Sequence, residues 1–188
     1  MSDAKQFGYP MRLGKTIMEQ RPVHPLNQMF HEVVHEQTVK HLGEISMSAE
    51  QYLVDLLVAF VRMERVFAVR NAAGHRVESI IEMVAEGDVR LHADSFTRER
   101  EVHKHIGDFI LFWSGVYPDF LRKVKLQSGF DLVCDYTRQG KESYHLVSTF
   151  SFAPFDQEAP TFQTLSDGFE DFAFVLQQVS RQTGIYAA

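Results

Sequence analysis

Apolar residues recur at helical spacing along almost the whole chain, and this periodicity limits the folds that the chain can adopt. Near the C-terminus six apolar residues follow a 3-4-3-4-3 spacing: Phe162, Leu165, Phe169, Phe172, Leu176 and Val179. Such spacing places all six on one side of an α-helix. No segment alternates apolar and polar residues in the way that a half-buried strand does. The pattern therefore predicts an all-α protein.

The same periodicity, read together with turn and capping signals, predicts about six or seven helices. An early helix includes Leu26 and ends near Gly43, and Ser48 with Gln51 forms a capping box ahead of a helix that runs to about residue 70. Further helices are expected over residues 77–87, 95–115, 130–150 and 162–179, with a loop over residues 153–160. We therefore expect a single-domain bundle over residues 21–188, preceded by an N-terminal arm over residues 1–20.

Length, charge and cysteine content restrict the class of protein. The 188 residues suit one domain, and the single cysteine, Cys134, cannot form an intrachain disulfide. Together with a first segment that lacks an apolar leader, this favours the reducing cytoplasm. The net charge of −6 disfavours nucleic-acid binding, and the longest apolar stretch, residues 53–61, is too short to span a membrane. The basic residues Arg98, Arg100 and Lys104 are expected on a solvated helix face.

His31, Glu32 and His35 form the pattern H-E-x-x-H in the expected early helix. In zinc proteases this spacing places two histidine ligands on one side of a helix, and the glutamate polarises the metal-bound water. A protein that binds zinc or iron at His31 and His35 is therefore one interpretation, and with Glu32 as the base it becomes a hydrolase. His41 has the position of the third ligand in the longer form of the motif.

Three observations weigh against this interpretation. Thr38 holds the position of the glycine that breaks the helix in the longer motif, so His41 should lie about 120° around and about 9 Å along an unbroken helix. Glu36 places a charge after the second histidine, where an uncharged residue is usual. The apolar seam of the segment points away from His31 and His35, which favours a solvated polar face.

Two E-x-x-H pairs also occur, and ferritin-like di-iron bundles use two such pairs with two further glutamates. The residues are Glu32, His35, Glu142 and His145, with Glu64 and Glu101 to complete a set. Because the chain has nine histidines, chance supplies pairs of this kind. His103 and His105 diverge on a helix, so we expect them at the surface or at a helix interface. Cys134 is expected to be a small buried residue and not a nucleophile.

Two segments in the second half of the chain contain closely spaced glycine, aspartate and aromatic residues. Residues 106–118 read IGDFILFWSGVYP, and residues 135–144 read DYTRQGKESY. They fit the patterns G-D-x-x-L-F-x-x-G-x-[FY]-P and D-Y-x-x-x-G-K-x-S-Y, and in this they resemble a group of bacterial helical proteins that has no established activity. The resemblance implies a helical, bacterial and cytoplasmic protein, and it transfers no functional residue.

Asp108 is the unusual residue of the first segment, because it lies among apolar neighbours. A carboxylate that is buried there needs a hydrogen-bonding partner. Lys141 or Tyr144 of the second segment is expected to provide it. Gly107 and Gly140 are expected to allow close contacts between helices.

The sequence therefore favours a helical protein that binds a small ligand or a protein partner without catalysis. The 16 phenylalanines are compatible with an apolar cavity between helices, and equally with a packed core. The metal-dependent alternative uses His31 and His35. The seam from Phe162 to Val179 is expected to pack within the chain, and a homodimer through it is the alternative.

Overall fold

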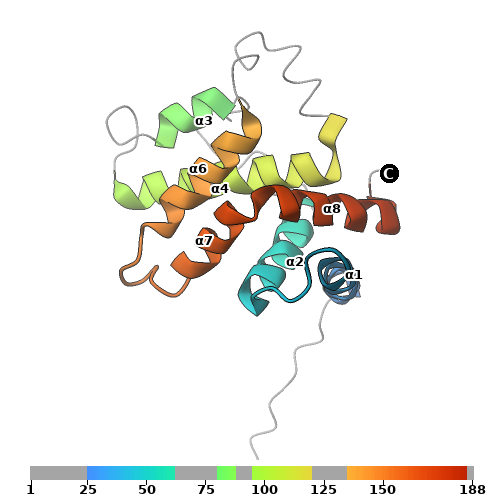
Figure 1. Cartoon of the computed structure of the whole chain (residues 1–188). Helices are drawn as coiled ribbons and strands as arrows, with labels where there is room; N and C mark the ends of the chain where they lie inside the picture. The colour runs from blue at the N-terminus through green and yellow to red at the C-terminus, as the bar shows by residue number, and fades with distance from the viewer. Residues whose placement is uncertain (1–24, 62–79, 88–94, 120–134, 186–188) are drawn as a thin grey trace, which may run out of the picture.

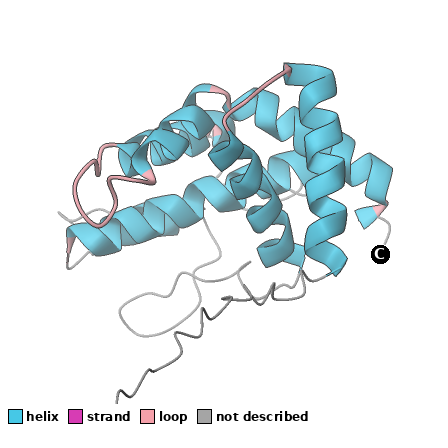
Figure 2. Ribbon diagram, turned by 90° about the horizontal axis from the view of Figure 1, so that it is seen from below, coloured by secondary structure: helices cyan, strands magenta, loops and turns pink. Residues whose placement is uncertain are grey.

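The computed structural model describes residues 25–61, 80–87, 95–119 and 135–185. Within these ranges every regular element is a helix and none is a strand (Figure 2). The helices are α1 (Pro25–Leu42), α2 (Met47–Val61), α3 (Ile80–Gly87), α4 (Phe96–Val116), α6 (Tyr136–Ser148), α7 (Ala159–Asp167) and α8 (Phe169–Thr183). They share one hydrophobic core. The prediction of an all-α, single-domain bundle is therefore confirmed.

Helix α4 lies at the centre of the bundle, with α6, α8 and α3 packed against it and α2 in lighter contact (Figure 1). It begins as the sequence predicts, because the side chain of Ser95 accepts a hydrogen bond from the backbone N–H of Arg98 at 3.2 Å. Its middle and C-terminal turns are buried on several sides, as expected for a helix that has neighbours all around it.

Helices α1 and α2 pack against each other, and α1 also packs against α8. Helix α1 ends before Gly43, whose φ of 76° is the left-handed conformation that suits glycine. Helix α2 begins one residue before the predicted Ser48, and the predicted capping box is wrong. The side chain of Ser46 accepts from the backbone N–H of Ala49 at 3.2 Å and caps the helix instead. The predicted continuation of this helix beyond Val61 lies outside the described residues.

The predicted C-terminal helix is divided into α7 and α8 at Gly168, which ends one helix and begins the next. The two helices pack on different partners, α7 on α6 and α2, and α8 on α4 and α1. A glycine accommodates the change of direction because its intrinsic helix propensity is low. All six seam residues from Phe162 to Val179 are nevertheless buried in the core of this chain. Packing within the chain thus uses the seam, and the homodimer stays a prediction.

Helix α6 crosses α4 and α8 closely at two glycines. A Cβ atom at Gly140 would overlap the ring of Phe169 on α8, and one at Gly107 of α4 would lie 2.6 Å from the ring of Tyr144. The predicted close contacts at these two glycines are confirmed. Helix α6 begins after Asp135, whose side chain accepts from the backbone N–H of Arg138 at 3.1 Å. The earlier part of the helix predicted over residues 130–150 lies outside the described residues.

No helix in the described ranges combines the length and the apolar character that crossing a membrane would need.

Candidate functional site

A buried carboxylate with three donors lies where α2, α4 and α6 meet. Asp108 on α4 is 6% exposed. Its Oδ1 accepts hydrogen bonds from the hydroxyl of Tyr144 at 2.9 Å and from the hydroxyl of Tyr52, and its Oδ2 accepts from Nζ of Lys104 at 2.7 Å. The predicted partner Tyr144 is confirmed. Lys141, the other predicted partner, instead binds Glu170 on α8 at 2.9 Å.

Both tyrosines of this cluster are held in the neutral form. Burial, followed by the negative charge of Asp108, raises the pKa of Tyr52 and of Tyr144 well above the ordinary value of 10.0. Neutral phenols are hydrogen-bond donors, and here both donate to the same carboxylate oxygen. The cluster is thus built around an anionic Asp108 whose charge is balanced by Lys104.

We expect the stability of the protein to fall steeply above about pH 10. The unfolded chain releases its phenol protons near pH 10, whereas Tyr52 and Tyr144 keep theirs in the folded state. Each such tyrosine should lower the free energy of unfolding by about 1.4 kcal/mol per pH unit above that point. Urea unfolding between pH 8 and pH 11 should show a shallower loss for Tyr144→Phe than for the wild type. Equal slopes for the two proteins would contradict the assignment.

The basic residues of α4 are not the solvated face that the sequence predicts. Arg100 is buried, and its Nη2 donates to Oε2 of Glu158 at 2.5 Å. Lys104, one turn further along, is about one quarter exposed and is paired with Asp108. The prediction failed because it considered one helix alone, whereas α7 and the loop before it cover this side of α4. Arg98 is half-buried near the start of the helix.

A cleft of about 670 Å³ opens above the Asp108 cluster, between α2, α4 and the start of α7. Its polar lining residues are Ser48, Gln51, Asp55, Lys104, Glu158 and Thr161. Its apolar wall consists of Tyr52, Val58, Ala59 and Phe162. A smaller hollow of about 50 Å³ shares Lys104 and Ala59 with the cleft and reaches Asp108. Asp108 therefore lies beneath the floor of the cleft, and Lys104 connects the two.

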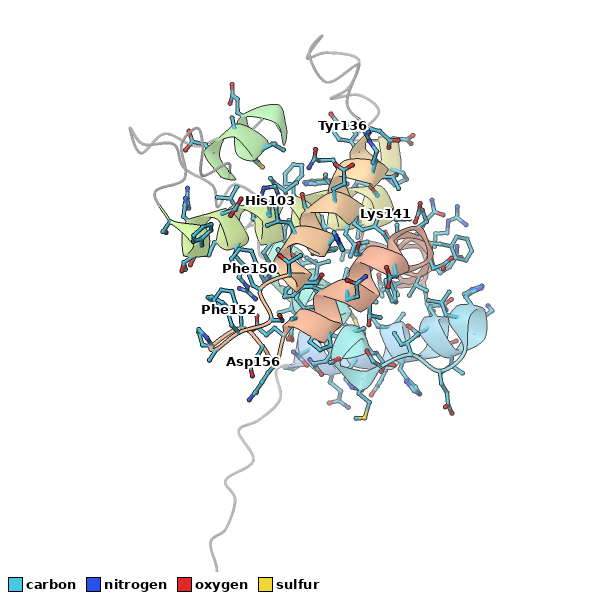
Figure 3. The ribbon with its side chains drawn as sticks, turned by 60° about the vertical axis from the view of Figure 1, so that its left-hand side comes forward. His103, Tyr136, Lys141, Phe150, Phe152 and Asp156 are labelled. Carbon is cyan, nitrogen blue, oxygen red and sulfur yellow. The ribbon has the colours of Figure 1, made fainter. Side chains whose placement is uncertain are left out.

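The loop between α6 and α7 supports one edge of this cleft. Figure 3 shows Phe150 and Phe152 along the loop and Asp156 close to the start of α7. The rings of Phe150 and Phe155 pack with that of Phe152, which is more than half exposed. The guanidinium carbon of Arg100 lies 4.1 Å from the ring centre of Phe155. This stacking, together with the ion pair to Glu158, attaches the loop to α4 and holds Glu158 at the cleft.

The H-E-x-x-H residues lie on the solvent-facing side of α1, and the buried Phe30 and Val34 lie on its other side. His31, Glu32 and His35 are all exposed, and Nδ1 of His35 lies 3.1 Å from the carboxylate of Glu50 on α2. Helix α1 runs unbroken to Leu42, so His41 does not join them, as predicted from Thr38. In the described residues, no group of three or more histidine, cysteine, aspartate or glutamate side chains could hold a metal ion.

The other potential ligands are also separated. Glu101, Glu142 and His145 are exposed on their helices, which contradicts the inward-facing arrangement of a di-iron bundle. His103 and His105 are buried at helix interfaces, the first 3.3 Å from the hydroxyl of Ser143 on α6 and the second stacked on Phe60 of α2. Three of the sequence predictions concern residues outside the described ranges: Glu64, Cys134 and the N-terminal arm, residues 1–20. The predictions for them stay predictions.

Elemental analysis tests the metal interpretation, which stays a prediction for His31 and His35. Two exposed histidines with one acidic neighbour provide fewer ligands than the four of a structural zinc site. We therefore expect far less than one zinc or iron per chain in protein purified without a histidine tag. A stoichiometric metal that is lost in the double variant His31→Ala/His35→Ala would instead establish a metal site on α1.

Comparison of the chain with protein-family models, with curated proteins and with solved structures gives no match.

Sequence reasoning missed most of the cleft. Tyr52, Lys104 and Glu158 come from three separate parts of the chain, and none of them belongs to a motif with a known spacing. The one available signal was Asp108 among apolar neighbours, which predicts a buried carboxylate with a partner. That signal indicates where the polar cluster lies, but not that a cleft opens above it.

Proposed function

We propose that the protein binds a small ligand in the cleft between α2, α4 and α7. The carrying observation is the position of Lys104, whose ammonium group lines the cleft and is held in place from below by Asp108. A volume of about 670 Å³ lies within the range of small-ligand sites. The cleft combines an apolar wall with a few fixed polar groups, which is the composition that orients a ligand.

The proposal is one of binding without catalysis. Asp108 already accepts hydrogen bonds on both oxygens, so it is poorly suited to remove a proton from a ligand. Tyr52 and Tyr144 have pKa values raised well above 10, so neither supplies a phenolate near neutral pH. Asp108 instead holds the ammonium group of Lys104 in place, and the two tyrosines hold Asp108, as a preorganised binding site requires.

A panel of related aromatic compounds tests the proposal by ligand-observed NMR and calorimetry. The panel contains benzoate, phenyl phosphate, benzylamine and benzyl alcohol, whose common ring suits the wall formed by Val58, Ala59 and Phe162. We expect at least one of them to bind the wild type. We also expect Ala59→Trp to abolish that binding, because the indole would fill the cleft.

Val39→Trp is the matched control, since it introduces the same side chain at an exposed position of α1 that does not line the cleft. This variant should bind as the wild type does. The proposal fails if no compound of the panel binds, or if Ala59→Trp binds as well as Val39→Trp does. Circular dichroism would verify that both variants keep their helical content.

A further inference from the structure

Two cations of α4 approach the same aromatic ring beside the cleft. Arg100 and Lys104 are four residues apart, which places them on one side of the helix. The guanidinium carbon of Arg100 lies 5.6 Å from the ring centre of Phe162, and Nζ of Lys104 lies 5.9 Å from it. Phe162 itself forms part of the apolar wall of the cleft. Lys104 lines the cleft at this end, and Arg100 lies behind Glu158, which also lines it.

One hydrogen-bond donor of the Arg100 guanidinium lacks an acceptor in the described part of the chain. Its side chain is 7% exposed, and its Nη2 donates to Glu158, but its Nε is buried without an acceptor among the described residues. A buried guanidinium N–H without an acceptor raises the free energy of the folded state, because it has lost its hydrogen bond to water and forms none within the protein. The site would therefore be stabilised by an additional oxygen acceptor next to this group.

The carboxylate of Glu158, which now pairs with Arg100, can be displaced into solvent by a ligand. Its side chain is 59% exposed, it lines the cleft, and it makes no side-chain cap for α7. An exposed carboxylate returns to water at little cost, whereas Arg100 stays buried behind it. Its departure would leave a position at the end of the cleft where Arg100 needs an anion.

We propose that the ligand of this cleft is an organic anion with an apolar body, whose oxyanion replaces Glu158 on Arg100 and accepts a second hydrogen bond from Lys104. This inference rests on the proposed function and specifies its ligand class. A carboxylate and a phosphate monoester both supply the oxyanion, and both match the planar donor pattern of a guanidinium. The apolar body would lie on Phe162, Val58 and Ala59.

The charges around the site are compatible with such a ligand. Asp108 neutralises Lys104 from below, and Lys104 has N–H donors beyond the one that Asp108 accepts. Asp55 is the other carboxylate among the lining residues, and it is exposed and accepts from Nε2 of Gln51 at 3.0 Å. Water and salt screen an exposed charge of this kind. With Glu158 displaced, the two cations then face the ligand at the Phe162 end.

The same aromatic panel tests the inference, because its members differ chiefly in charge. We expect benzoate or phenyl phosphate to bind the wild type more tightly than benzyl alcohol and benzylamine do, and the comparison of the two anions separates a carboxylate ligand from a phosphate one. Lys104→Met should weaken anion binding by about tenfold or more, the effect of one charge-assisted hydrogen bond. Glu158→Gln should strengthen it by about threefold or more, because the competing carboxylate is gone.

The Glu158→Gln result is decisive, because glutamine keeps an oxygen acceptor for Arg100 at this exposed position, whereas Lys104→Met removes the counter-ion of the buried Asp108. Unchanged or weaker anion binding by Glu158→Gln, or tighter binding of benzylamine than of benzoate, would overturn the anion assignment while leaving a small-ligand cleft. If no compound binds, or if Ala59→Trp does not block binding, the proposed function itself is overturned, and the inference with it.

Discussion

Replacing Asp108 with alanine is expected to lower the free energy of unfolding by about 3–5 kcal/mol, the usual cost of removing one partner from a buried ion pair. The substitution would leave the buried hydroxyls of Tyr52 and Tyr144 without their acceptor. It would also leave Lys104 without its counter-ion in a partly buried position. Urea unfolding followed by circular dichroism would measure the loss. Asp108→Asn should cost less, because it retains an oxygen acceptor.

Glu142→Ala is a suitable control for Asp108→Ala. Glu142 is exposed on α6, and its carboxylate lies 3.9 Å from Arg138, the distance of a weak surface pair. Removing it should change stability by less than about 0.5 kcal/mol. If the two substitutions had the same small effect, the Asp108 cluster would not be a buried network of the kind described above.

Replacing Phe169 with alanine is expected to lower the free energy of unfolding by about 3–5 kcal/mol. The ring is 1% exposed at the start of α8, where it rests directly on the backbone of Gly140 and packs against the ring of Tyr144 at 5.9 Å between centroids. Because Gly140 has no side chain, it cannot fill the space that the ring leaves. The cavity should therefore persist, and urea unfolding would measure the resulting loss in the free energy of unfolding.

Phe174→Ala is the matched control, with the same change of side chain on the same helix. Phe174 is 45% exposed and makes an edge contact with His41 on α1. Its removal should cost about 1 kcal/mol or less, because it transfers little buried area to water. A loss as large as that of Phe169→Ala would place Phe174 in an interface that this chain alone does not contain, such as one between two copies.

Local signals in the sequence predicted the helices well. The apolar spacing of residues 162–179 identified six side chains that are all buried, and Ser95 and Gly43 marked a helix start and a helix end correctly. These signals succeed because capping, glycine conformation and amphipathic spacing depend on residues within a few turns of one another. They fail at Gly168, where one amphipathic pattern continues through two helices that pack on different neighbours.

The polar residues of the site were predicted only in part. Lys141 or Tyr144 was expected to bind Asp108, because a buried carboxylate needs a hydrogen-bonding partner, and the hydrogen bond from Tyr144 is present. Tyr52 and Lys104 were not expected there. Lys104 lies on α4 itself, but its role depends on α7 covering that side of the helix, and Tyr52 comes from α2, 56 residues before Asp108. No local sequence pattern predicts that residues so far apart in the chain come into contact.

The sequence by itself determined that this chain is an all-α bundle, because helical periodicity and the lack of strand alternation are properties of neighbouring residues. It also determined that Asp108 needs a partner and that His41 cannot join His31 and His35 on one helix. Only the tertiary structure decided that Arg100 is buried, that Lys104 is paired with Asp108, and that a cleft lies beside them. The physical reason is that burial, pairing of charges and cavity shape arise from contacts between helices that are far apart in the chain.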